Sequence, residues 1–195
     1  MEVKDISVGF CLTGSFCTFD KVFLAIEKLV ELGAIIMPII SNSVNSNDTR
    51  FIKAAETKRF LKLTTGRDAV NKIIDVEPIG PKVLLDIIVV APCTGNTMAK
   101  IANGISDTPV TLAVKSHLRN DRPVLLAIST NDALSGNAKN LGLLLNVKNI
   151  FFVPMGQDNF KSKKTSVVAD MSLIIDAVKL ALEKKQIQPM LIDPK

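Results

Sequence analysis

The sequence predicts a single-domain α/β protein with a three-layer flavodoxin-like or Rossmann-like fold, in which helices cover both faces of a doubly wound parallel sheet. Its 195 residues are enough for one well-buried core and too few for two ordinary domains. Short apolar runs alternate along the chain with stretches of helical periodicity, as in such folds. The runs contain few polar residues, which is typical of strands buried on both faces. We treat residues 1–195 as one domain, with a flexible or interacting tail from about residue 186.

The first strand and the first helix are the clearest elements. Residues 8–12 are apolar and end in Thr13-Gly14-Ser15, after which apolar side chains recur at helical spacing until Gly33. Two prolines within residues 77–81 predict a loop. Further strands are expected at residues 34–40, 84–91, 124–128 and 150–153. Further helices are expected at residues 48–61, 67–74, 98–105, 137–145 and 167–182.

Composition excludes several classes of protein. The longest apolar runs fall far short of the roughly 18 residues that span a bilayer. The N-terminus lacks the pattern of a secretory signal, so we expect a cytoplasmic protein without a membrane segment. The three cysteines show no C-x-x-C spacing, and neither a disulfide nor a metal site is expected. The net charge of +5 is scattered and Trp and Tyr are missing, which argues against nucleic-acid binding and leaves a mild preference for small anions.

Small hydroxyl and amide residues follow four of the expected strands, and ligands of such sheets bind at the carboxyl ends of the strands. Ser15 and residues 94–97 precede helices, where hydroxyl and backbone N–H groups can hold a phosphate ester. Helix capping explains each residue alone at least as well. Binding is the better interpretation of the whole set. The four stretches are residues 13–15, 41–43, 92–97 and 129–131.

Several familiar chemical signatures are missing. The spacing from Gly9 to Gly14 is that of a P-loop, but Ser15 stands where the lysine must be, and no G-x-G-x-x-G follows the first strand. His117 is the only histidine, and because no Cys or Ser partner is evident we expect it to serve at the surface or in capping. Cys93 lies within the expected ligand turn, and a small buried residue is its expected role.

Residues 91–107 resemble the central motif of the flavin-dependent cysteine decarboxylase superfamily, and Thr13-Gly14-Ser15 supports the match. That superfamily includes phosphopantothenoylcysteine decarboxylases, lantibiotic peptide decarboxylases and flavin prenyltransferases. The resemblance implies bound FMN and a homo-oligomer built from trimers, with the flavin near subunit contacts. The FMN-binding residues that it implies are Gly14, Ser15, Phe16, Ser41, Ser43, Thr94, Gly95, Asn96 and Thr97.

A closer resemblance, to the B-subunit family of spore dipicolinate synthases, covers nearly the whole chain. It rests on residues 13–18, 92–96, 122–134 and 149–158. It implies a role with a separate A subunit in oxidising a dihydrodipicolinate-type precursor to dipicolinate, in the mother cell of a sporulating bacterium. A small dicarboxylate is then the substrate, and NAD(P) belongs to the partner subunit if it is used. The candidate catalytic residues are Ser129, Thr130 and Asn131.

Two departures from the decarboxylase pattern argue against cysteine decarboxylation. Pro78 matches the position of the catalytic histidine, counted back from Asp86, and Asn131 is what remains of the motif that orients the substrate carboxylate. Basic residues, Lys100 or those of residues 119–122, are expected to meet the substrate carboxylates, with Arg119 better explained as a solvated side chain. Two alternatives stay open: a non-catalytic partner that stabilises or regulates a nicotinamide-dependent A subunit, and an FMN-dependent decarboxylase or flavin prenyltransferase relative.

Overall fold

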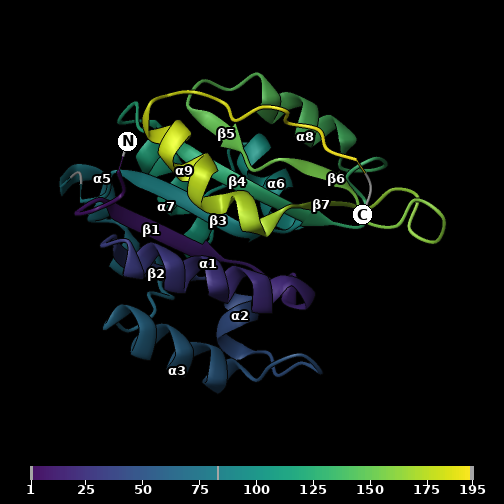
Figure 1. Cartoon of the computed structure of the whole chain (residues 1–195). Coiled ribbons are helices and arrows are strands. Elements are labelled where there is room, and N and C mark those ends of the chain that lie inside the picture. The colour runs from purple at the N-terminus through teal and green to yellow at the C-terminus, as the bar shows by residue number, and fades with distance from the viewer. Residues whose placement is uncertain (1, 83, 194–195) are drawn as a thin grey trace.

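A computed structural model describes residues 2–82 and 84–193, and within them seven strands form one sheet between two groups of helices (Figure 1). The strands are β1 (Ser7–Leu12), β2 (Ile35–Ile40), β3 (Ile87–Cys93), β4 (Val124–Thr130), β5 (Ile150–Phe152), β6 (Met155–Gln157) and β7 (Val167–Ala169). The α-helices are α1 (Phe19–Glu31), α2 (Asn42–Ser46), α3 (Ala54–Thr65), α4 (Ile73–Val76), α5 (Ile79–Lys82), α6 (Gly95–Ala102), α7 (Pro109–Leu118), α8 (Ala138–Leu145) and α9 (Ile174–Leu182). Two short 3-10 helices, η1 (Phe16–Thr18) and η2 (Met171–Leu173), precede α1 and α9.

The sheet has the order β2-β1-β3-β4-β7-β6, and β5 also pairs with β4. Strands β2, β1, β3, β4 and β5 run parallel to one another, with Val8 of β1 opposite Ile36 of β2 and Ile87 of β3. Helices α1 and α9 cover one face, and α6 and α7 cover the other (Figure 1). The α/β fold class and its largely parallel sheet are therefore confirmed.

The interior explains why the sequence folds this way. Strands β3 and β4 are buried from end to end apart from the half-buried Thr130, as expected for strands covered on both faces. In β1, a Cβ atom on Gly9 would lie 2.5 Å from Cδ1 of Ile88 and 2.7 Å from Cδ1 of Leu85. Glycine at this position thus lets side chains from the β3 segment close over β1.

Several expectations about local structure are wrong. Residues 167–169, expected in the last helix, pair as strand β7 with β6 and β4, so α9 begins only at Ile174. The helix expected from residue 48 begins at Ala54. Residues 67–72 are not helical, because Val70 donates its N–H to Pro38 O and accepts from Ile40 N, both at 2.8 Å, and α4 begins only at Ile73. These bonds satisfy backbone groups of β2, which otherwise forms the edge of the sheet. Residues 77–81 are not a simple loop either, since a short turn at Glu77 and Pro78 leads into helix α5.

The outer edge of β4 has two partners, which the sequence pattern does not predict. The first half of β4 pairs with β5, and Ser129 and Thr130 at its end pair with β7 in the antiparallel sense. Pro154 has no N–H to continue the β5 ladder, and the chain turns there into the β6–β7 hairpin. The segment after α9 returns along β6, where Met155 N donates to Met190 O at 2.9 Å.

Candidate functional site

The carboxyl ends of β1 and β3 are tied together by Thr13. Its buried hydroxyl donates to Pro92 O at 2.6 Å and accepts from Thr94 N at 3.0 Å. Parallel strands end at the same edge of a sheet, so these bonds join two of the polar stretches that the sequence singled out. The crevice that they form has a fixed backbone frame.

Ser15 and Ser129 bring the ends of β1 and β4 together across this crevice. Their hydroxyl oxygens lie 2.7 Å apart, although β3 separates the two strands in the sheet. Ser129 is buried and Ser15 is half-buried. One hydroxyl hydrogen serves the bond between them, so the pair keeps one donor for an anionic ligand.

The start of helix α6 supplies backbone donors to the same crevice. The Thr94 hydroxyl caps the helix by accepting from Thr97 N at 3.4 Å. Within the described residues, the N–H groups of Gly95 and Asn96 have no protein acceptor, as is usual in the first turn of a helix. The Asn96 side chain is exposed. This helix start combines free donors with a dipole that favours negative charge.

The end of β2 adds a further pair of hydroxyl groups. Ser41 caps α2 by accepting from Val44 N at 3.4 Å. A Cβ atom on Gly14 would lie 3.5 Å from the Cβ of Ser43, so the β1 and β2 loops touch. Phe16 is half-buried, and its ring centroid lies 5.0 Å from that of Phe19. The expected FMN residues of these two loops therefore lie on adjacent elements.

Thr130 is the first member of a hydrogen-bonded network that the sequence did not predict. The Thr130 hydroxyl donates to one Asp132 oxygen at 2.5 Å, and the Asn137 amide donates to the other at 2.6 Å. Asn140 continues the chain by donating to Asn137 Oδ1 at 2.7 Å. A Cβ atom on Gly95 would lie within 2.7 Å of polar atoms of Thr130, Asp132 and Asn137. The only sequence signal was the clustering of amide and carboxylate residues after β4.

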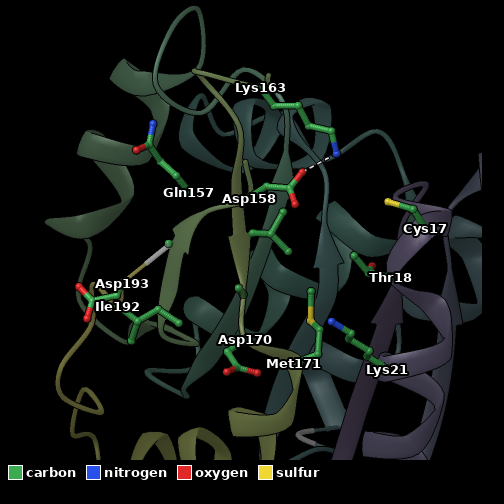
Figure 2. A pocket seen from close by; sticks show the side chains of 13 residues that line it. Cys17, Thr18, Lys21, Gln157, Asp158, Lys163, Asp170, Met171, Ile192 and Asp193 are labelled. Carbon is green, nitrogen blue, oxygen red and sulfur yellow. Dashed lines mark hydrogen bonds and ion pairs between the residues drawn. The ribbon is translucent and has the colours of Figure 1, made fainter. Parts of the chain in front are cut away.

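A groove lies beside the crevice, over the β6–β7 hairpin (Figure 2). Its volume is about 280 Å³. On one wall, the sulfur atom of Cys17 lies 3.9 Å from the hydroxyl oxygen of Ser15. Val168, which also lines the groove, is the strand partner of Ser129. The charged and thiol residues that line it are Cys17, Lys21, Asp158, Lys163, Asp170 and Asp193.

Arg122, in the basic stretch expected to bind substrate, lies elsewhere, which corrects that part of the prediction. Arg122 Nη1 donates to Leu85 O at 2.5 Å and to Asp86 Oδ1 at 3.1 Å, at the amino ends of β3 and β4 and thus at the opposite edge of the sheet. Arg119 is exposed at the end of α7, at that same edge. Lys100 forms an ion pair with Asp107 at 2.8 Å.

His117 is buried rather than at the surface, so that expectation is also wrong. It lies in the last turn of α7, with 2% of its surface exposed, and within the described residues its Nε2 atom has no hydrogen-bond partner. Burial lowers its pKa to about 4. The imidazole is held neutral in the core, away from the carboxyl ends of the strands.

Cys93 is fully buried at the end of β3, as expected for a small packing residue. Burial raises the pKa of its thiol to about 12 and raises that of the neighbouring Cys11 as well. Because the thiolate is the reactive form, neither thiol is suited to nucleophilic chemistry. Pro78, in the turn before α5, likewise offers no group that can carry a proton.

The residues at the strand ends fit a flavin mononucleotide. The Ser15–Ser129 pair and the free N–H groups of Gly95 and Asn96 provide the short donors that a phosphate ester requires. No cluster of three or more metal-ligating side chains occurs in residues 2–82 and 84–193. In the same part of the chain, none of the helices has the length and apolar character needed to cross a membrane.

Comparisons with known proteins agree with this geometry. A family model described as Flavoprotein matches residues 1–182. The B subunit of dipicolinate synthase from Bacillus subtilis (strain 168) is 47% identical over 192 residues, which cover 98% of this chain and 96% of the relative.

Solved structures give the same result. The crystal structure of the dipicolinate synthase B subunit from Bacillus halodurans has a TM-score of 0.92 and 42% identity, with complete coverage of both chains. The peptidyl-cysteine decarboxylase EpiD, 21% identical with a TM-score of 0.63 over 88% of this chain and 97% of its own, shares the fold. On the extent of the family match and the 47% identity, the chain belongs to the Flavoprotein family.

Proposed function

We propose that this chain is the flavin-binding B component of a dipicolinate synthase and that it acts with an A subunit to oxidise a dihydrodipicolinate-type precursor during sporulation. The observation that carries the proposal is the convergence of four polar strand ends, around the Ser15–Ser129 pair, beside a small groove. The similarity to the two Bacillus B subunits supports it.

Each part of the site has a role in this proposal. The Ser15–Ser129 pair, together with the N–H groups of Gly95 and Asn96, binds the flavin phosphate. Bound FMN would supply a hydride acceptor for a ring that gains aromatic stability on oxidation.

The second product of the oxidation is a proton, and we assign its acceptance to Thr130 and Asp132. Because the Thr130 hydroxyl donates to Asp132, it can act only as an acceptor toward a further donor. A proton lost by the precursor can pass through Thr130 to the Asp132 carboxylate, while Asn131 borders the substrate.

Turnover of the precursor tests the proposal directly. We expect the purified chain with FMN to be inactive alone and its mixture with the A subunit to release dipicolinate, measured by ultraviolet absorbance of the product. The A subunit alone should not reach the rate of the mixture. Full activity of the A subunit without this chain would contradict a catalytic role.

A second prediction concerns FMN affinity after substitution of residues at the proposed phosphate site. Ser15→Leu removes one hydroxyl of the pair and is expected to weaken FMN binding about tenfold, since a hydrogen bond to a charged group contributes roughly 1.5–3 kcal/mol. Asn96→Leu keeps the backbone N–H but puts a bulky apolar side chain beside the phosphate donors, and it should weaken binding as well. Calorimetric titration with FMN measures the loss. Ser162→Leu, in the exposed loop between β6 and β7, is the control and should bind FMN like the unmodified chain. Unchanged affinity in both site variants would exclude these residues from the phosphate site.

A non-catalytic role beside a nicotinamide-dependent A subunit is the second candidate. Pro78 favours this role, because it stands in the turn before α5 at the position that matches the decarboxylases' catalytic histidine, and proline cannot transfer a proton. In that case the chain would raise the stability of its partner and add no flavin-dependent turnover.

We also propose a homo-oligomer built from trimers that helps to close the flavin site. Large apolar side chains at the surface support association between copies, and the most exposed within the described residues are Leu24, Leu63, Ile74 and Leu191.

A further inference from the structure

We infer that the groove over the β6–β7 hairpin binds the substrate carboxylates, with Lys21 as the anchor and Lys163 released from Asp158 as the second contact. The inference deepens the proposed function, because it assigns the substrate class to a part of the site that the phosphate donors do not occupy. The groove takes a small ring that carries two carboxylate groups.

The walls of the groove come from segments far apart in the sequence (Figure 2). Cys17, Thr18 and Lys21 form one wall, at the start of α1. The hairpin forms the floor, and the segment at Ile192 forms the opposite wall. A Cβ atom on Gly156 would lie 2.7 Å from Ile192 O, so this wall lies directly against β6. The groove therefore exists only in the folded chain.

The size and position of the groove indicate a substrate rather than the whole cofactor. Its volume of about 280 Å³ lies just below the range of roughly 300–1,000 Å³ for small-molecule pockets. A single ring with two carboxylates is closer to that volume than a flavin with its phosphate. Cys17 and Val168 connect the groove to the Ser15–Ser129 pair, so the groove and the phosphate donors belong to one continuous site.

Positive charge lies at two places in the groove, at Lys21 and on the loop of residues 158–164. Lys21 has no ion-pair partner within the described part of the chain, and Figure 2 shows its amino group turned toward Met171 across the groove. The loop of residues 158–164 carries three lysines and one aspartate, which places a net charge of +2 at the rim. Such a rim attracts small dianions and speeds their entry.

The acidic residues of the groove have other roles or positions. Asp170 accepts from Ser172 N at 3.1 Å and from Ser172 Oγ at 2.6 Å, and so caps η2. The carboxylate of Asp193 points away from Lys21 and Lys163 in Figure 2. Asp158 is the acidic side chain that competes directly with a ligand.

The ion pair between Lys163 and Asp158 is therefore the exchangeable element. Its atoms lie 2.5 Å apart, and the Lys163 side chain is 58% exposed. The Asp158 carboxylate raises the pKa of Lys163, so the amino group remains charged at neutral pH. Ion pairs at such exposure contribute little to stability, so a ligand carboxylate can replace Asp158 at little cost.

Binding of the proposed product, pyridine-2,6-dicarboxylate, tests the inference by calorimetry in metal-free buffer. Lys21→Met should weaken binding about tenfold, as should Lys163→Met. Asp158→Asn should strengthen it, because the competing carboxylate is removed. Lys28→Met is the matched control: Lys28 lies two turns along α1 and lines a neighbouring groove without touching this one. It should leave affinity unchanged.

The outcomes separate this inference from the flavin proposal. Equal affinities for the unmodified chain and Lys21→Met, weaker binding by Asp158→Asn, or no measurable product binding would each overturn the groove assignment. FMN titration of the same variants is the second measurement. If the product binds with the expected pattern but the chain takes up no FMN, the groove assignment stands and the flavin proposal fails. If FMN binds but neither lysine substitution changes the affinity for the product, the flavin proposal stands and the groove assignment fails.

Discussion

Replacing Gly95 with alanine is expected to lower the free energy of unfolding by about 3 kcal/mol, the upper part of the usual cost of overpacking. The added Cβ atom would lie 2.6 Å from Thr130 Oγ1 and 2.7 Å from both Asn137 Nδ2 and Asp132 Oδ1. Thr130 and Asn137 both donate hydrogen bonds to the Asp132 carboxylate, so none of these groups can move without breaking a hydrogen bond of a partly buried network. FMN binding should weaken too, because the start of α6 would shift.

Gly142→Ala is the matched control for this substitution. Gly142 also lies in a helix, α8, but a Cβ atom there would have no neighbour within 4 Å. Alanine in an open helical position is expected to stabilise the protein by roughly 0.5–1 kcal/mol. Urea unfolding of both variants measures the two effects, which should have opposite signs. A Gly95→Ala protein as stable as the unmodified chain would show that the Asp132 network can rearrange freely.

Acid should destabilise the protein through His117 at a pH well above that at which most carboxylates titrate. Burial lowers the pKa of His117 to about 4 in the folded chain, against 6.5 for the unperturbed group. Between these values the unfolded chain binds a proton that the folded chain does not, so the stability present above pH 6.5 is lost as the pH falls toward 4. Linkage gives a loss of about 2 kcal/mol at pH 5 relative to pH 7.5.

His117→Leu isolates this effect, because the chain has no other histidine. At pH 7.5 the two proteins should differ little in stability, since the substitution removes a buried nitrogen that lacks a partner but also removes the imidazole's hydrogen bond to the Asp86 backbone. The difference in stability between the two proteins should grow by about 2 kcal/mol when urea unfolding is repeated at pH 5. Carboxylates titrate equally in both proteins and cancel. Equal pH dependence of the two proteins would show that His117 is protonated in the folded state.

The fold was predictable because its signals are local. Short continuous apolar runs such as residues 124–128 favour strands covered on both faces, and the helices that cover them show their own periodicity. The exceptions arise from distant partners. Residues 67–72 are not helical because the edge of β2 takes Val70 as a partner, and no property of that segment alone indicates this.

The amino-acid sequence by itself determined the α/β class and the gathering of polar residues at one edge, because parallel strands place their carboxyl ends together whatever their exact register. Only the tertiary structure decided which of those residues meet. The bond between Ser15 and Ser129, 114 residues apart, depends on the order of β1, β3 and β4. The same order puts Arg122 at the far edge, and the groove needs α1, the hairpin and the C-terminal segment together. Side-chain neighbours across such distances are set by packing, which a local pattern does not encode.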